Sequence, residues 1–370
     1  MNLYDNRLVG LLAVMLFGMS DVLFSVAAIG QTVSHGSAIA VEKPFKAPAS
    51  DKDKKPRGLS GMACLGKDGD QSRECLVVND EETFVEVAVL TGKTLRPTGT
   101  TIAIVEKGEA GVGILGTPRI AKCGEKGKFA ELDGEGISVF GDYVYVISSH
   151  SCSSAGKYKP SSYLISRFKM ASSTAFVSGA APAAVERTWR GGDMLVSSGA
   201  AAAYGLPKKE GTNIEGIAVV GDHLYAGLRT PTSGGSAYLV RAPVTALFAP
   251  GKDPLAANTV ETRTLDFGNN TGVRDFASMI DGSLLILTGP TIEQAGVEYQ
   301  VWHLPAPVWT SKPVARVVVK TDAKAKKPSE VAKAEVITVV RQVGPKVNVI
   351  VGYDNVDDGA PTEHEIVLGP

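Results

Sequence analysis

The sequence lacks an excess of charge of either sign. It has 38 Lys and Arg residues against 39 Asp and Glu residues, a net charge of −1. A nucleic-acid-binding protein needs a basic surface that neutralises phosphates, so we expect no nucleic-acid partner. Charged residues make up only 21% of the chain and hydrophobic residues 44%, which favours a folded core over disorder.

Standard catalytic motifs are absent. The chain contains no Gly-x-Ser-x-Gly elbow, His-Glu-x-x-His, Walker-type phosphate loop or Cys-x-x-Cys. An ordinary serine hydrolase is therefore not expected. The sequence alone does not decide whether the protein is an enzyme.

An uninterrupted apolar run of membrane-spanning length is missing, because Asp21 separates the apolar stretches 8–17 and 22–29. Small residues at Ser25-Val26-Ala27 fit a signal peptide, residues 1–27, that is cut after Ala27. A second candidate cut follows Ala40, and an uncleaved signal anchor is the alternative. Once processed, the protein is expected to be periplasmic or extracellular and not integral to a membrane.

The stretch 41–57 is rich in Lys and Pro, so residues 28–57 are interpreted as a flexible linker and residues 58–370 as the folded domain. The domain is expected to be a monomer.

The four cysteines suggest two disulfides, because their number is even and export leads to an oxidising compartment. Cys64 and Cys75 lie in adjacent apolar runs separated by a charged turn, which favours their pairing and leaves Cys123 with Cys152. Free buried thiols are the alternative.

Glycine and proline are plentiful, at 41 and 20 residues, and they punctuate a repeat. Each copy has an apolar strand, a turn such as Gly141-Asp142 or Gly221-Asp222, and a second alternating strand. Four copies are clear and a fifth is weaker; they occupy residues 58–82, 133–151, 213–231, 272–290 and 334–355. Repeated four-stranded sheets predict an all-β fold, a β-propeller with five or six four-stranded blades. A double-sheet sandwich would not explain the recurrence.

Polar residues recur at equivalent places in these copies, so they are expected to gather at one mouth of the central channel. The candidate ligand-binding residues are Asp80, Glu81, Asp133, Glu135, His150, Asn213, Glu215, Arg229, Arg274 and Asp275. Carboxylates such as Asp133, Glu135 and Glu215 are ligands that Ca²⁺ prefers, and the basic residues suit a phosphate or carboxylate. Alternatively, each acidic residue caps local backbone or ties neighbouring blades.

The segments NIEGIAV, DGEGISV and GVRDFASM, with the turns and strands that follow them, resemble the bacterial family catalogued as domain of unknown function 3616, over residues 57–355. The Asp-x-Glu-Gly motif is also similar to motifs of phytase-like propellers, some of which are calcium-dependent phosphohydrolases. This second resemblance implies that Glu135 and Glu215 lie near a calcium-bridged phosphate.

Two functions follow from these observations. The first is an exported propeller whose channel binds a metal ion and a small anionic ligand, with hydrolysis of a phosphoester or ester as a further possibility. The second is a non-catalytic scaffold that recognises a partner in the cell envelope.

Overall fold

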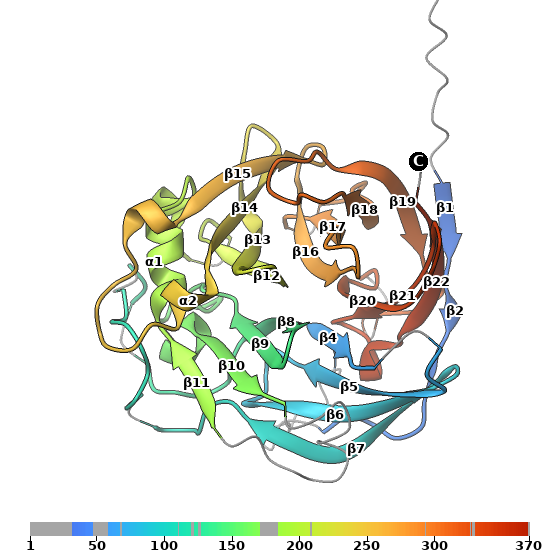
Figure 1. Ribbon diagram of the computed structural model, residues 1–370, viewed down its shortest axis with the longest axis horizontal. Helices are drawn as coiled ribbons and strands as arrows, with labels where there is room; N and C mark the ends of the chain where they lie inside the picture. Colours follow the sequence, from blue (N-terminus) through green and yellow to red (C-terminus); the bar gives the residue numbers. More distant parts are fainter. Residues whose placement is uncertain are drawn as a thin grey trace, which may run out of the picture. The chain divides into compact units, whose positions relative to one another are not determined.

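The computed structural model describes residues 32–46, 58–66, 69–109, 111–119, 122–124, 127–170, 184–207, 209–292, 294–325, 327 and 330–368. These residues form five sheets of four or five strands around a central axis, the blades of a β-propeller (Figure 1). The predicted all-β propeller is confirmed, with five blades among the described residues. The expected signal peptide, residues 1–27, lies outside them.

Each blade is an antiparallel meander whose first strand lies innermost. Blade 1 contains β4 (Gly61–Cys64), β5 (Ser72–Val78), β6 (Phe84–Thr91) and β7 (Thr94–Ala103). Blade 2 contains β8 (Gly134–Phe140), β9 (Tyr143–Ser148), β10 (Ile165–Lys169) and β11 (Val185–Thr188). Blade 3 contains β12 (Asn213–Val220), β13 (His223–Ser233), β14 (Ser236–Pro243) and β15 (Glu261–Asp266).

Blade 4 contains β16 (Thr271–Ser278), β17 (Leu284–Pro290), β18 (Gln300–Leu304) and β19 (Val314–Lys320). Blade 5 contains β20 (Ala334–Val343), β21 (Lys346–Tyr353) and β22 (Thr362–Val367). The connections carry two helices, α1 (Arg190–Val196) and α2 (Val244–Leu247), and 3-10 turns at Pro160–Tyr163, Ala201–Ala203, Ala257–Thr259 and Asp357–Gly359. No helix among the described residues is long and apolar enough to cross a membrane.

The hairpins of blades 2 and 3 turn at the predicted Gly-Asp pairs. Gly141 and Gly221 have φ angles of 57° and 60°, and they connect β8 to β9 and β12 to β13. A two-residue hairpin turn needs positive φ at its first position, which glycine adopts without steric cost.

The apolar core is divided among the interfaces between blades. The innermost strands β4, β8, β12, β16 and β20 contact their neighbours around the ring. Gly136 permits one such approach, because a Cβ there would lie 3.1 Å from the carbonyl oxygen of Glu215 in the next blade. Apolar clusters fill the spaces between blades, including blades 4 and 5, and blades 5 and 1.

The N-terminal residues 32–46, which we call the strap, run along the outer edges of three consecutive blades (Figure 1). In the strap, β1 (Thr32–His35) pairs with β19 of blade 4, β2 (Ser37–Ala38) with β22 of blade 5, and β3 (Ala40–Val41) with β7 of blade 1. Here the structure differs from the expected linker. The outermost strand of a blade has backbone N–H and C=O groups that no strand of its own blade pairs. These groups pair with the strap even though the strap has only a weak hydrophobic pattern.

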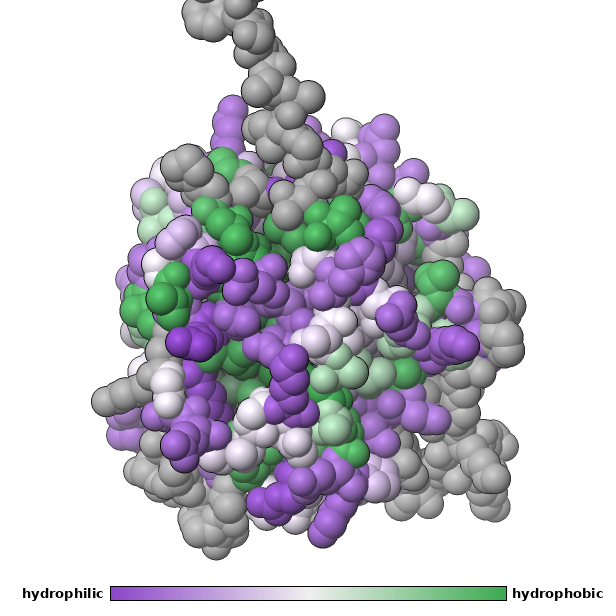
Figure 2. Space-filling model, turned by 90° about the vertical axis from the view of Figure 1, so that its right-hand side faces the viewer, coloured by the Kyte–Doolittle hydropathy of each residue, from purple (hydrophilic) through white to green (hydrophobic). Residues whose placement is uncertain are grey.

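Two apolar side chains anchor the strap where the ring closes. Ile39 and Phe45 are buried in the cluster between blades 5 and 1. The Ile39 N–H donates to Pro361 O at 2.9 Å, and the Phe45 N–H donates to Asp358 Oδ1 at 2.9 Å. Figure 2 shows the side of the molecule on which β1 and β2 lie, where hydrophilic side chains cover much of the surface.

The predicted disulfides are confirmed. Cys64 is bonded to Cys75, which lies directly opposite it in the β4–β5 hairpin. Cys123 is bonded to Cys152 and ties the connection before blade 2 to the connection that follows β9.

The strap bears on the choice between the two predicted cleavage sites. A cut after Ala40 would remove β1, β2 and the start of β3, whereas a cut after Ala27 leaves the strap complete. We therefore expect mass spectrometry of the mature protein to find Ala28 at the N-terminus. A retained Met1, or a chain that begins after Ala40, would contradict this prediction.

Candidate functional site

Four of the five innermost strands carry a β-bulge at the same level. The pairing register shifts by one residue around Glu135 in β8, Glu215 in β12, Arg274 in β16 and Glu335 in β20. A bulge leaves one residue outside the ladder and changes the direction of its side chain. In blade 1 the equivalent residue is Ser60, which precedes β4. The bulges therefore place three carboxyls and a guanidinium at one end of the channel.

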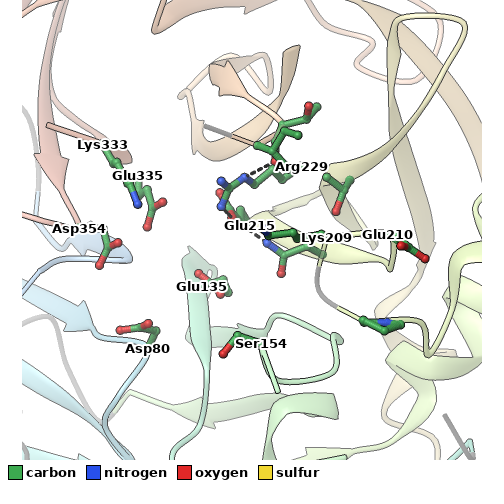
Figure 3. A pocket seen from close by; sticks show the side chains of 15 residues that line it. Asp80, Glu135, Ser154, Lys209, Glu210, Glu215, Arg229, Lys333, Glu335 and Asp354 are labelled. Atoms are coloured by element: carbon green, nitrogen blue, oxygen red, sulfur yellow. Dashed lines mark hydrogen bonds and ion pairs between the residues drawn. The ribbon is translucent and has the colours of Figure 1, made fainter. Parts of the chain in front are cut away.

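This end, which we call the polar mouth, is a cavity of about 660 Å³ (Figure 3). Its ionisable lining consists of three basic residues, Lys209, Arg229 and Lys333, and six acidic ones, Asp80, Glu135, Glu210, Glu215, Glu335 and Asp354. The other end of the channel is an opening of about 90 Å³ that is lined by smaller and mostly apolar residues such as Ala63, Ile137 and Ile337.

An ion-pair network joins three blades beneath the polar mouth. Arg274 is completely buried; its Nη1 lies 2.6 Å from Glu215 Oε2 and its Nη2 lies 2.9 Å from Glu335 Oε1. Arg229 Nη1 donates to Glu215 Oε1 at 2.8 Å, and its Nε donates to Thr291 O at 2.8 Å. Glu215 is therefore shared by two guanidinium groups.

Two carboxyls of the polar mouth hold their protons near neutral pH. Burial raises the pKa of Glu335 to about 8; repulsion by Asp354 adds to the effect and Arg274 opposes it. Burial raises the pKa of Asp354 to about 7, with repulsion by Asp80 adding to the effect. Removal of a carboxylate from water disfavours its charged form.

The structure brings six of the predicted ligand-binding residues together. Asp80, Glu135, Asn213, Glu215 and Arg229 line the cavity, and Arg274 lies behind Glu215. Asn213 Nδ2 donates to Glu215 Oε1 at 2.8 Å. The expected approach of Glu215 and Arg274, 59 residues apart in sequence, is observed directly.

Asp275 lies in the wall between blades. It follows the bulge, so its side chain points to the neighbouring blade, where its Oδ2 accepts the N–H of Ile337 at 2.8 Å. Its Oδ1 accepts the N–H of Phe276 at 2.8 Å. This arrangement matches the alternative, structural interpretation of the acidic residues, in which they tie neighbouring blades.

His150, Asp133 and Glu81 are not among the residues that line the cavity. His150 is completely buried against Tyr163, its Nδ1 lies 2.8 Å from Ser148 O, and burial lowers its pKa to about 4. Asp133 accepts a hydrogen bond from the Ser149 hydroxyl. The Glu81 N–H donates to Asn79 Oδ1 at 2.8 Å, within the turn after β5.

Glu335, Asp354 and Lys333 are residues of the polar mouth that the sequence-based set omitted. Glu335 and Asp354 belong to the weakest repeat copy, and Lys333 directly precedes it. One sequence feature could have identified Glu335. The segment Ala334-Glu335-Val336-Ile337 matches Ile214-Glu215-Gly216-Ile217, with valine in place of the glycine of the stronger copy.

The described residues do not contain a group of three or more His, Cys, Asp or Glu side chains arranged to hold a metal ion. In the polar mouth, Glu215 and Glu335 instead contact arginines. The Ca²⁺ site stays a prediction, and we derive no chemistry through a metal.

Several solved structures resemble the chain at low identity. An α-L-arabinofuranosidase from Podospora anserina is 9% identical, with 92% of this chain and 97% of that chain covered and a TM-score of 0.44. A levansucrase mutant from B. subtilis is 10% identical, with 89% of each chain covered and a TM-score of 0.43. Likeness at this level is not evidence of a shared activity. Among curated proteins, none matches the chain.

The family comparison concerns the C-terminal part of the chain. Residues 201–369 match the family described as "Protein of unknown function (DUF3616)". This span contains blades 3 to 5 and, with them, Glu215, Arg229, Arg274 and Glu335. The predicted resemblance is confirmed over this span, because residues 201–369 match the model of the DUF3616 family.

Proposed function

We propose that the polar mouth binds a small ligand through an anionic group, which Arg229 and Lys333 hold. The orientation of Arg229 carries this proposal. Its Nε donates to Thr291 O and its Nη1 donates to Glu215 Oε1, and these two bonds fix the guanidinium in the wall of the cavity. A guanidinium that is already oriented loses little freedom when it binds a carboxylate or phosphate.

The acidic residues of the polar mouth are compatible with an anion. Glu215 is neutralised by two arginines. Glu335 and Asp354, with pKa values of about 8 and about 7, are wholly or partly protonated at pH 7. A protonated carboxyl does not repel an anion and donates a hydrogen bond to it.

Glu335 and Asp354 support catalysis after the ligand has bound. A group whose pKa lies near the working pH is suited to general acid–base catalysis. Esters and phosphoesters of small anions are therefore the substrates to test. Binding without turnover would identify a ligand-binding protein, and a failure of every anion to bind would favour the scaffold.

Replacing Arg229 with Met is expected to weaken the binding of acetate and sulfate about tenfold or more, because charge-assisted hydrogen bonds contribute about 1.5–3 kcal/mol. Affinity is read from the rise in melting temperature with anion concentration. Arg229→Lys should retain part of the affinity. Arg316→Met, an exposed substitution on β19, is the control and should change nothing.

Anion affinity should also fall as the pH rises from 6 to 9. Asp354 and then Glu335 lose their protons over this range, and each loss adds a negative charge to the polar mouth. Acetate and sulfate keep a constant charge there, so the change reports on the protein. A flat pH profile, or equal affinity in Arg229→Met, would refute the proposal. Parallel titrations with Ca²⁺ and with a chelator test the predicted calcium dependence.

A further inference from the structure

A second cavity adjoins the polar mouth on the side of blades 4 and 5. Its volume is about 910 Å³, and we call it the side groove. Lys333 lines both cavities. The segment after β17 also passes from one to the other, with Thr291 in the polar mouth and Gln294 in the side groove. The two cavities therefore meet at Lys333.

The side groove differs from the polar mouth in chemistry. Small apolar side chains line it, among them Val297, Val319, Ala323, Ala325 and Ala332. Val319 and Ala332 belong to the apolar cluster between blades 4 and 5, and Ala323 packs against that cluster, so the groove exposes the upper surface of this core.

Three of the charged residues that line the side groove, Glu298, Lys320 and Glu330, form ion pairs. Lys320 Nζ lies 2.6 Å from Glu298 Oε1. Glu330 is paired with Lys327 at 3.1 Å and also accepts a hydrogen bond from Asn355. Lys324 lies at the exposed rim. The groove therefore offers apolar contact along its length, and its cation next to the polar mouth is Lys333.

Asn355 fixes the junction between the two cavities. Its Oδ1 accepts the N–H of Lys333 at 2.8 Å, and its Nδ2 donates to Val331 O at 2.8 Å. The residue before it, Asp354, lines the polar mouth. One buried side chain thus holds the backbone of Lys333 at the boundary.

We infer that the ligand is an amphiphilic anion, whose charged head lies between Arg229 and Lys333 and whose apolar chain lies in the side groove. This inference rests on the proposed anion site and adds to it a site for the apolar chain of the ligand. Three observations carry it: the meeting of the two cavities at Lys333, the apolar floor of the side groove, and the ion pairs that Lys320 and Glu330 form. Together the cavities exceed the volume that a small anion fills.

The test compares propionate with octanoate, which carry the same head and differ by five methylene groups. Octanoate is expected to bind at least tenfold more tightly, because each buried methylene favours binding. Propionate should compete with octanoate, and Arg229→Met should weaken both.

Ala323→Trp fills the side groove and should remove the advantage of octanoate without changing the affinity for propionate. Val331→Trp serves as a second blocking variant if the first does not fold. Ala256→Trp, at an exposed position outside both cavities, is the control and should keep the advantage.

Three outcomes are distinguishable. If neither probe binds, the proposed anion site is wrong. If propionate binds and octanoate is no tighter, the anion site stands and the amphiphilic ligand is wrong. If octanoate keeps its advantage in both blocking variants, its chain lies outside the groove and the inference is also wrong.

Discussion

Replacing Arg274 with Met is expected to lower the free energy of unfolding by about 3–5 kcal/mol. The guanidinium is completely buried and contacts Glu215 and Glu335 from two other blades. Without it, both carboxyls must be protonated or remain charged in a site that excludes water. Urea unfolding at pH 8 would measure the loss.

The pH dependence separates loss of charge pairing from loss of packing. Glu335 has a pKa raised to about 8 beside Arg274, and it should rise further without that arginine. The folded variant then binds more protons than its unfolded chain, so its stability falls with rising pH. We expect a smaller penalty at pH 6 than at pH 9. An equal penalty at both values would contradict the electrostatic explanation, and Arg316→Met should be neutral at both.

Removing the strap is expected to have the second large effect. A chain that begins at Gly58 should be less stable than one that begins at Thr32 by about 3 kcal/mol, because Ile39 and Phe45 leave the interface between blades 5 and 1. It should also aggregate, since β7, β19 and β22 would present open edges. Denaturant unfolding and light scattering would measure the two effects.

A point variant tests the strap without shortening the chain. A Cβ at Gly36 would lie 2.5 Å from His364 Nε2 and 2.6 Å from Thr362 Cβ, so Gly36→Val should displace β2 from β22. Partial loss of stability is expected. If neither the truncation nor Gly36→Val alters unfolding, the strap does not contribute to closing the ring.

The sequence predicted the features that repeat strongly. Glu215 and Arg274 occupy equivalent places in clear copies of one pattern, and this equivalence placed them together. Asp275 was misleading because it follows Arg274 directly, and alternation along a strand sends adjacent side chains to opposite faces. A bulge was not readable from the residues alone, so the direction of each side chain needed the structure.

Glu335 and the strap were not predicted, because the repeat pattern around Glu335 and the strand pattern of the strap are both weak. Glu335 lies in a copy that has valine in place of the glycine after the acidic residue. The strap strands are only four, two and two residues long, and their pairing partners lie in blades far away in the sequence. Local periodicity holds no information about such partners.

The strap also fixes when the protein can finish folding. Ser34 donates a hydrogen bond to Glu365, a residue made 331 positions later, and β1 pairs with β19, which is also synthesised near the end. β1 and β2 therefore cannot pair until β19 and β22 have been synthesised. Contacts of such separation form late. Closure of the ring by the strap is therefore among the last steps of folding, after the sequence of all five blades has been synthesised.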